Sequence, residues 1–92
     1  MERAKERWHI LLSGRVQHVG LRYTALRLAR ELSLTGWVRN LPDGRVALEL
    51  QGERAALGRF LLALESRPPI EIRETEKSVL PCREGESRFV CG

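Results

Sequence analysis

Hydrophobic residues near the start of the chain follow two different spacings. Residues 8–13 form a short, largely apolar run before a glycine-containing loop, which predicts a buried strand. After the loop, apolar residues recur three and four positions apart, as on one face of a helix, at Leu21, Ala25, Leu28, Ala29 and Leu32. We therefore expect a helix over residues 21–33.

The middle of the sequence predicts a hairpin. A strand over residues 37–41 is followed by Pro-Asp-Gly at 42–44, which supplies a fixed φ, a side-chain acceptor and a residue that tolerates positive φ. Three aliphatic residues then alternate with more polar ones: Val46, Leu48 and Leu50. The alternation predicts a strand over residues 45–51 with one buried and one exposed face, and Gly52 as the turn after it.

Helical spacing returns in residues 53–66, at Leu57, Phe60, Leu61 and Leu64. The Pro68-Pro69 pair would end this second helix. The more polar residues 70–80 predict an edge strand, and residues 88–90 predict a short last strand.

The predicted order is β-α-β-β-α-β with an extra C-terminal strand. Two helices that each carry one apolar stripe need a common surface to cover, and an antiparallel sheet with one apolar face provides it. We therefore expect an α+β protein, a ferredoxin-like α/β sandwich in which two helices cover an antiparallel sheet. With 92 residues and no linker, residues 1–92 are expected to form one domain.

Composition narrows the cellular context. No stretch approaches the roughly 18 to 20 apolar residues of a membrane-spanning helix, and residues 1–7 lack the apolar centre of a secretory signal. We therefore expect a cytoplasmic monomer with no membrane association. Cys82 and Cys91 show no metal-binding spacing and are expected to be free thiols.

The net charge of +4 comes almost wholly from arginine, because Lys5 and Lys77 are the only lysines. Arginine forms forked hydrogen bonds to phosphate and carboxylate, so either a small anionic substrate or a nucleic acid would suit this surface. Charge alone does not choose between these two partners, and most of the basic residues are expected to be solvated surface groups.

The loop of residues 14–20 joins the first strand to the start of the first helix. Unpaired main-chain amides and the helix dipole attract anions at such a junction. Gly20-Leu21-Arg22 replaces the Gly-Lys-Ser/Thr of a P-loop, so nucleoside triphosphate chemistry is not expected. Arg22 lies in the first helical turn, where the dipole disfavours a cation unless an anion is near; the alternative is a plain surface arginine.

Asn40 is the only asparagine in the chain and ends the second predicted strand. Its amide could donate to and accept from a water molecule without titrating, which is what positioning a nucleophile requires. Asparagine is equally suited to a strand end before a turn, and position alone favours that simpler interpretation.

Two segments together resemble the signatures of the acylphosphatase family. Residues 14–22, Gly-Arg-Val-Gln-His-Val-Gly-Leu-Arg, resemble the first signature. Gly-Trp-Val-Arg-Asn at 36–40, together with Gly-Arg-Val at 44–46 and Gly52, is similar to the second signature. The resemblance extends from Trp8 to Val90. Leu21 departs from it, since the family usually has an aromatic residue or methionine there, and His18 stands where glycine is commoner.

This resemblance implies a hydrolase that cleaves the carboxyl-phosphate bond of small acyl phosphates to a carboxylate and inorganic phosphate. By position in the motifs, Arg22 would be the phosphate-binding arginine and Asn40 would orient the attacking water. Main-chain amides of the loop would share the phosphate with Arg22, at Arg15, Val16, Gln17, His18, Val19 and Gly20. No cofactor and no metal are expected, since His9 and His18 are the only histidines and no carboxylates stand at ligand spacing.

Two other functions suit the same fold. RNA-recognition modules share this element order but stack bases on aromatic residues of the first and third strands, and the third predicted strand has none. A protein-interaction module without activity is the other alternative. The expected partners are therefore acyl phosphate and inorganic phosphate, and no nucleic acid.

Overall fold

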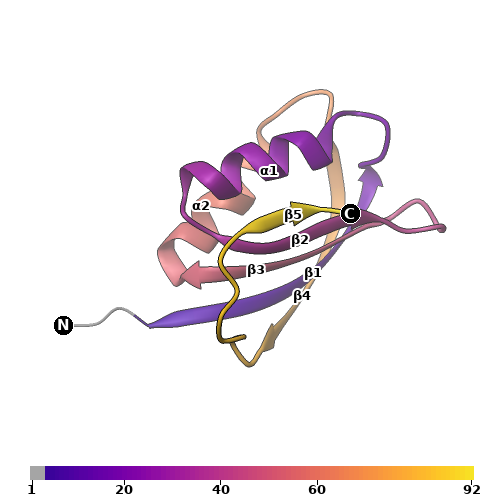
Figure 1. The fold of residues 1–92 in the computed structure, drawn as a ribbon. Helices are drawn as coiled ribbons and strands as arrows, with labels where there is room; N and C mark the ends of the chain where they lie inside the picture. Colours follow the sequence, from indigo (N-terminus) through magenta and orange to yellow (C-terminus); the bar gives the residue numbers. More distant parts are fainter. Residues whose placement is uncertain (1–3) are drawn as a thin grey trace.

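Two helices cover one face of a five-stranded sheet in the computed structural model, which describes residues 4–92 (Figure 1). The elements in chain order are β1 (Lys5–Arg15), α1 (Leu21–Glu31), β2 (Thr35–Asn40), β3 (Val46–Glu53), α2 (Arg54–Glu65), β4 (Glu71–Leu80) and β5 (Phe89–Cys91). The predicted ferredoxin-like βαββαβ order, with its extra C-terminal strand, is confirmed.

The sheet has the strand order β4-β1-β3-β2-β5, so β4 is an edge strand, as predicted. The pairs among β1, β2, β3 and β4 are antiparallel, whereas β5 runs parallel to β2. The sheet is therefore mixed, and the expectation of a wholly antiparallel sheet was wrong for its last strand. The β4–β5 connection crosses the sheet before β5 begins, so β5 joins β2 in the same direction (Figure 1).

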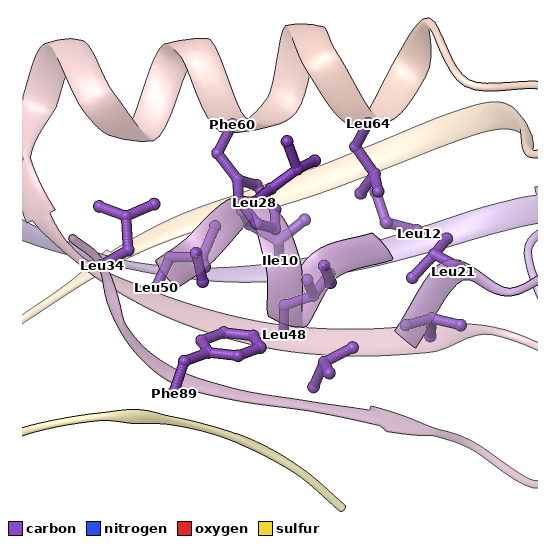
Figure 2. Packing of buried hydrophobic residues seen from close by; sticks show 14 of the residues in the cluster. Ile10, Leu12, Leu21, Leu28, Leu34, Leu48, Leu50, Phe60, Leu64 and Phe89 are labelled. Carbon is purple, nitrogen blue, oxygen red and sulfur yellow. The ribbon is translucent and has the colours of Figure 1, made fainter. Parts of the chain in front are cut away.

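The hydrophobic core lies between the helices and one face of the sheet (Figure 2). Alternate residues of the two central strands supply the sheet side, at Ile10, Leu12, Leu48 and Leu50, and all four are fully buried. The helices supply Leu21, Leu28, Phe60 and Leu64 from the predicted apolar stripes. Each buried side chain of this size contributes about 1.5–3 kcal/mol. Leu21, the departure from the family pattern, is thus a core residue.

Several predicted boundaries shift when the elements pack together. Helix α1 ends at Glu31, two residues early, and Ser33 then has a φ of 57° that turns the chain towards β2. Gly52 was predicted to be a turn but lies inside β3. A β-carbon at Gly52 would come within 2.5 Å of the end of the Leu34 side chain, so a larger residue there would have to displace Leu34.

The second face of β3 is not exposed, contrary to the alternation-based prediction. Arg7 of β1 is only 1% exposed and lies across this face, where its guanidinium binds three side chains. Its Nε donates to Glu49 at 2.8 Å, and its Nη1 donates to Gln51 at 3.1 Å and to Glu86 at 2.8 Å. Glu86 belongs to the β4–β5 connection, so this network ties the connection to the sheet.

We expect this network to make stability pH-dependent. Burial opposes ionisation of Glu49 and Glu86, but hydrogen bonds and positive charge together outweigh it. Arg7 acts on both carboxylates, His9 adds to its effect at Glu49, and Thr35 and Arg83 add to it at Glu86. Both pKa values therefore lie below the ordinary 4.5. Because the folded-state pKa values are lowered, the stabilisation is complete above pH 4.5 and is lost as the pH falls through the folded-state values. The free energy of unfolding, measured with urea, should therefore decline below that pH.

Glu49→Gln tests the source of this decline. The variant should lose about 2 kcal/mol of unfolding free energy at neutral pH, and its stability should fall less between about pH 6 and about pH 3. The exposed Glu65→Gln on α2 is the matched control and should show the full wild-type decline. A Glu49→Gln variant with the wild-type pH profile would contradict the assignment.

Candidate active site

The loop between β1 and α1 has a backbone that needs glycine and left-handed residues. A β-carbon on Gly14, which has a φ of 122°, would collide with the main chain of Glu71 and Arg73 in β4. His18 and Gly20 both adopt left-handed conformations, with φ values of 60° and 78°. These left-handed residues turn the chain sharply before α1 begins at Leu21.

The main-chain amides of this loop find no acceptor in the part of the chain that the structure describes. Within residues 4–92, none of the amides from Val16 to Gly20 donates a hydrogen bond. Helix α1 also begins without a side-chain cap and without an acidic residue in its first turn. Consecutive amides of this kind, next to a helix N-terminus, form an anion-binding concavity.

One pocket of about 340 Å³ brings the two predicted catalytic residues together. Arg22 reaches it from the first turn of α1, and Asn40 reaches it from the end of β2. The other lining residues are Val16, His18, Gly20, Leu21, Tyr23, Leu26 and Cys91. Of the predicted phosphate-binding residues, Arg15, Gln17 and Val19 do not line this pocket.

Arg22 and Asn40 both have hydrogen-bonding groups available. Arg22 is exposed, and its Nη1 donates to the main-chain oxygen of Gly92 at 3.2 Å, while its other guanidinium protons have no acceptor among residues 4–92. The half-buried Asn40 side chain makes no hydrogen bond to any of residues 4–92. Both side chains can therefore bind a ligand or a water molecule without breaking a strong internal contact.

The Gln17 side chain points away from the pocket and holds the loop in place. Its amide nitrogen donates to the carbonyl of Leu41 at 2.8 Å and to the carbonyl of Arg45 at 2.9 Å. These two carbonyls flank the β2–β3 turn, and Leu41 follows Asn40 directly. Gln17 thus fixes the distance between the amide-bearing loop and the strand end that carries Asn40.

The β2–β3 turn itself is stiffened by Asp43, as its sequence predicted. The Asp43 carboxylate accepts a hydrogen bond from the main-chain amide of Arg45 at 3.1 Å and one from its Nε at 2.8 Å. These hydrogen bonds, the main-chain one foremost, lower the pKa of Asp43 below its ordinary value. Asp43 therefore acts in the turn and not in the pocket.

Besides Leu21, which was predicted as a core residue, three residues of the pocket were not predicted from the sequence. Tyr23 and Leu26 lie on α1, and Cys91 lies on β5, where it pairs with Val38 of β2. Tyr23 and Leu26 lie outside the predicted apolar stripe of α1. An apolar residue off the core face of a helix is a candidate for a binding pocket, so this pattern could have identified both residues. No local signal could have placed Cys91 here, because its position depends on the parallel pairing of β5 with β2.

The cysteines and the potential metal ligands of residues 4–92 do not form a second site. Cys82 and Cys91 are both free and exposed, as expected. Across residues 4–92, no three His, Cys, Asp or Glu side chains lie close enough to hold a metal ion. The two helices that the structure describes are both too short and too polar to cross a membrane.

Comparison with known proteins points to one family. The sequence model of the acylphosphatase family matches residues 8–91. An acylphosphatase of Archaeoglobus fulgidus is 52% identical over 61 residues, which is 66% of this chain and 68% of that protein. The crystal structure of a Bacillus subtilis acylphosphatase superposes with a TM-score of 0.88 at 33% identity, over 95% of this chain and 98% of that one. An acylphosphatase structure from Coxiella burnetii gives 0.87 at 30% identity, covering 96% and 93% of the two chains.

Proposed function

Because this chain belongs to the acylphosphatase family and is a hydrolase of small acyl phosphates, we propose that Arg22 and Asn40 carry its reaction without a metal ion. The observation that supports this most is the single pocket that both side chains line, next to a run of unpartnered main-chain amides. Each part of the hydrolysis can be derived from these groups.

The phosphoryl group of the substrate binds to the loop and to Arg22. Amides from Val16 to Gly20 donate to its oxygens, and the Arg22 guanidinium adds charge-assisted hydrogen bonds. The negative charge on these oxygens persists through a loose transition state. Donors held in place beforehand, as Gln17 holds this loop, stabilise that charge without reorganising during the reaction.

Asn40 positions the attacking water. Its side-chain carbonyl accepts a hydrogen bond from the water and its amide group donates one to the water, so the water oxygen is aimed at phosphorus on the side opposite the departing carboxylate. The carboxylate is a stable leaving group with a low pKa, so no strong general acid is needed to protonate it. The products are the carboxylate and inorganic phosphate.

Turnover in the presence of a chelator tests the metal-free mechanism. We expect the purified protein to hydrolyse acetyl phosphate and benzoyl phosphate at the same rate before and after extended dialysis against EDTA. The positive charge in this mechanism comes from Arg22 and the amides, which a chelator does not remove. Activity that disappears with EDTA and returns with added Mg²⁺ or Zn²⁺ would contradict the proposal.

The two alternative functions gain no support. Trp8, the one Trp, Tyr or Phe of β1, faces the helices and is only 6% exposed, so it cannot stack on a nucleotide base. The inactive interaction module is equally unsupported by the comparisons. A cytoplasmic location, a monomeric state, the absence of nucleic-acid binding and a single domain over residues 1–92 stay predictions.

A further inference from the structure

The pocket is larger than a phosphoryl group requires. Its volume of about 340 Å³ corresponds to roughly ten water molecules in the liquid. The phosphoryl group, with one phosphorus and its oxygens, would occupy the part next to the loop amides, Arg22 and Asn40. The acyl group of the substrate must therefore occupy the part of the pocket that the phosphoryl group does not fill.

The lining of this remaining part is apolar. It consists of Tyr23 in the first turn of α1, Leu26 in the second turn, and Cys91 on β5. Leu26 lies one helical turn after Arg22, so both side chains are on the same side of α1. Leu26 is half-buried and packs against the core, which fixes its position, while Tyr23 is 66% exposed.

The charges around the pocket also restrict the acyl group. In the described part of the chain, no Asp, Glu or Lys side chain lines it, and its charged or titratable side chains other than Cys91 and Tyr23 are Arg22 and His18. With Arg22 engaged by the phosphoryl group, little cationic charge is left to pair with a second anionic group. Burying such a group without a partner costs binding free energy.

We infer that Tyr23, Leu26 and Cys91 form an acyl subsite that selects substrates with an apolar acyl group, aromatic or branched aliphatic, over acyl groups that carry a carboxylate or a second phosphate. Tyr23 and Leu26 are its specificity-determining residues. This inference rests on the proposed function, because it assumes that the phosphoryl group lies at Arg22 and the loop amides.

The ratio of kcat/KM for benzoyl phosphate to kcat/KM for acetyl phosphate tests the subsite. Acetyl has only a methyl group to place there, whereas benzoyl has a whole ring. Tyr23→Ala and Leu26→Ala should each lower this ratio about ten-fold, the scale of discrimination by apolar pocket contacts. Most of the loss should be a higher KM for benzoyl phosphate, because the ring is bound in the ground state and the transition state alike.

The matched control is Leu62→Ala. Leu62 is an aliphatic residue of α2 with 65% exposure, similar to that of Tyr23, but it does not line the pocket. The ratio of kcat/KM for benzoyl phosphate to kcat/KM for acetyl phosphate in Leu62→Ala should equal that of the wild type. Leu26 contacts the core, so its replacement could also lower stability, and thermal unfolding of each variant is measured by circular dichroism. Tyr23 is highly exposed, so Tyr23→Ala tests the subsite without affecting the fold.

The outcomes separate this inference from the proposed function. If the wild-type protein hydrolyses both substrates but the ratio stays within two-fold in Tyr23→Ala and Leu26→Ala, the acyl subsite is wrong and the proposed function stands. A wild-type preference for a monoacyl phosphate of a dicarboxylic acid over benzoyl phosphate would also overturn the subsite. If the wild-type protein hydrolyses neither substrate, the proposed function fails, and the subsite fails with it.

Discussion

Replacing Arg22 with alanine is expected to lower kcat/KM for acetyl phosphate by more than about 10³-fold, the scale seen when a phosphate-binding arginine is lost from phosphoryl-transfer sites. Among residues 4–92, Arg22 is the only Lys or Arg side chain that lines the pocket. The loop amides can still bind phosphate in the variant, but they carry only partial charges. Both substrate binding and transition-state stabilisation should therefore suffer, with kcat reduced and KM raised.

Two further variants show whether the effect depends on the guanidinium or on helix α1. Arg27→Ala removes another exposed arginine of α1, whose partner Glu31 lies 3.9 Å away, and should leave activity unchanged. Arg22→Lys keeps the charge but loses the forked geometry, so it should recover only part of the rate. Near wild-type turnover by a folded Arg22→Ala protein would remove the basis of the mechanism.

Asn40→Ala should lower kcat by about 10² to 10³, roughly 3–4 kcal/mol of transition-state stabilisation, as when one oriented donor is removed. The expected loss is in kcat, since the proposed contact is with the attacking water and not with the bound phosphoryl group. The KM for acetyl phosphate should change little. Steady-state kinetics over a range of substrate concentrations separates the two parameters.

Stability provides the control for Asn40. Its side chain has no hydrogen-bond partner among the described residues, so its removal should change the free energy of unfolding by about 0.5 kcal/mol or less, as for other substitutions that break no internal contact. Asn40→Asp keeps the shape but loses the amide donor and adds negative charge near the phosphoryl group, and it should also be strongly impaired. If Asn40→Asp matched the wild-type kcat, the water-positioning role would have to be abandoned.

The buried network around Arg7 bears indirectly on the same pocket. Arg7 holds Glu86, and Gln51 accepts a hydrogen bond from the main-chain amide of Arg83 at 2.8 Å. Both contacts fasten the β4–β5 connection, which leads to β5 and so to Cys91 at the pocket. The acid-sensitive contacts that stabilise the fold therefore also anchor one wall of the site.

The sequence by itself determined the parts of this protein that depend on local pattern. Spacings of three to four residues identified both helices and alternation identified β3, because helices and strands repeat with those periods. Short runs bounded by turn residues indicated the other strands, but the full extent of β1 and core residues such as Leu34 and Val16 were not predicted. The loop after β1 and the position of Asn40 before the Pro-Asp-Gly turn could also be predicted, since both motifs are short and contiguous. The proposed roles of Arg22 and Asn40 came from resemblance, and local chemistry alone left simpler alternatives open.

Tertiary structure alone decided the features that join distant segments. Arg7 meets Glu86 across 79 positions, which makes the second face of β3 buried although its alternating pattern predicted exposure. The parallel pairing of β5 with β2 brought Cys91 to the pocket, and close packing against Leu34 placed Gly52 inside a strand. Periodicity reports which way a side chain points from its own element, but it carries no information on which distant segment will cover it.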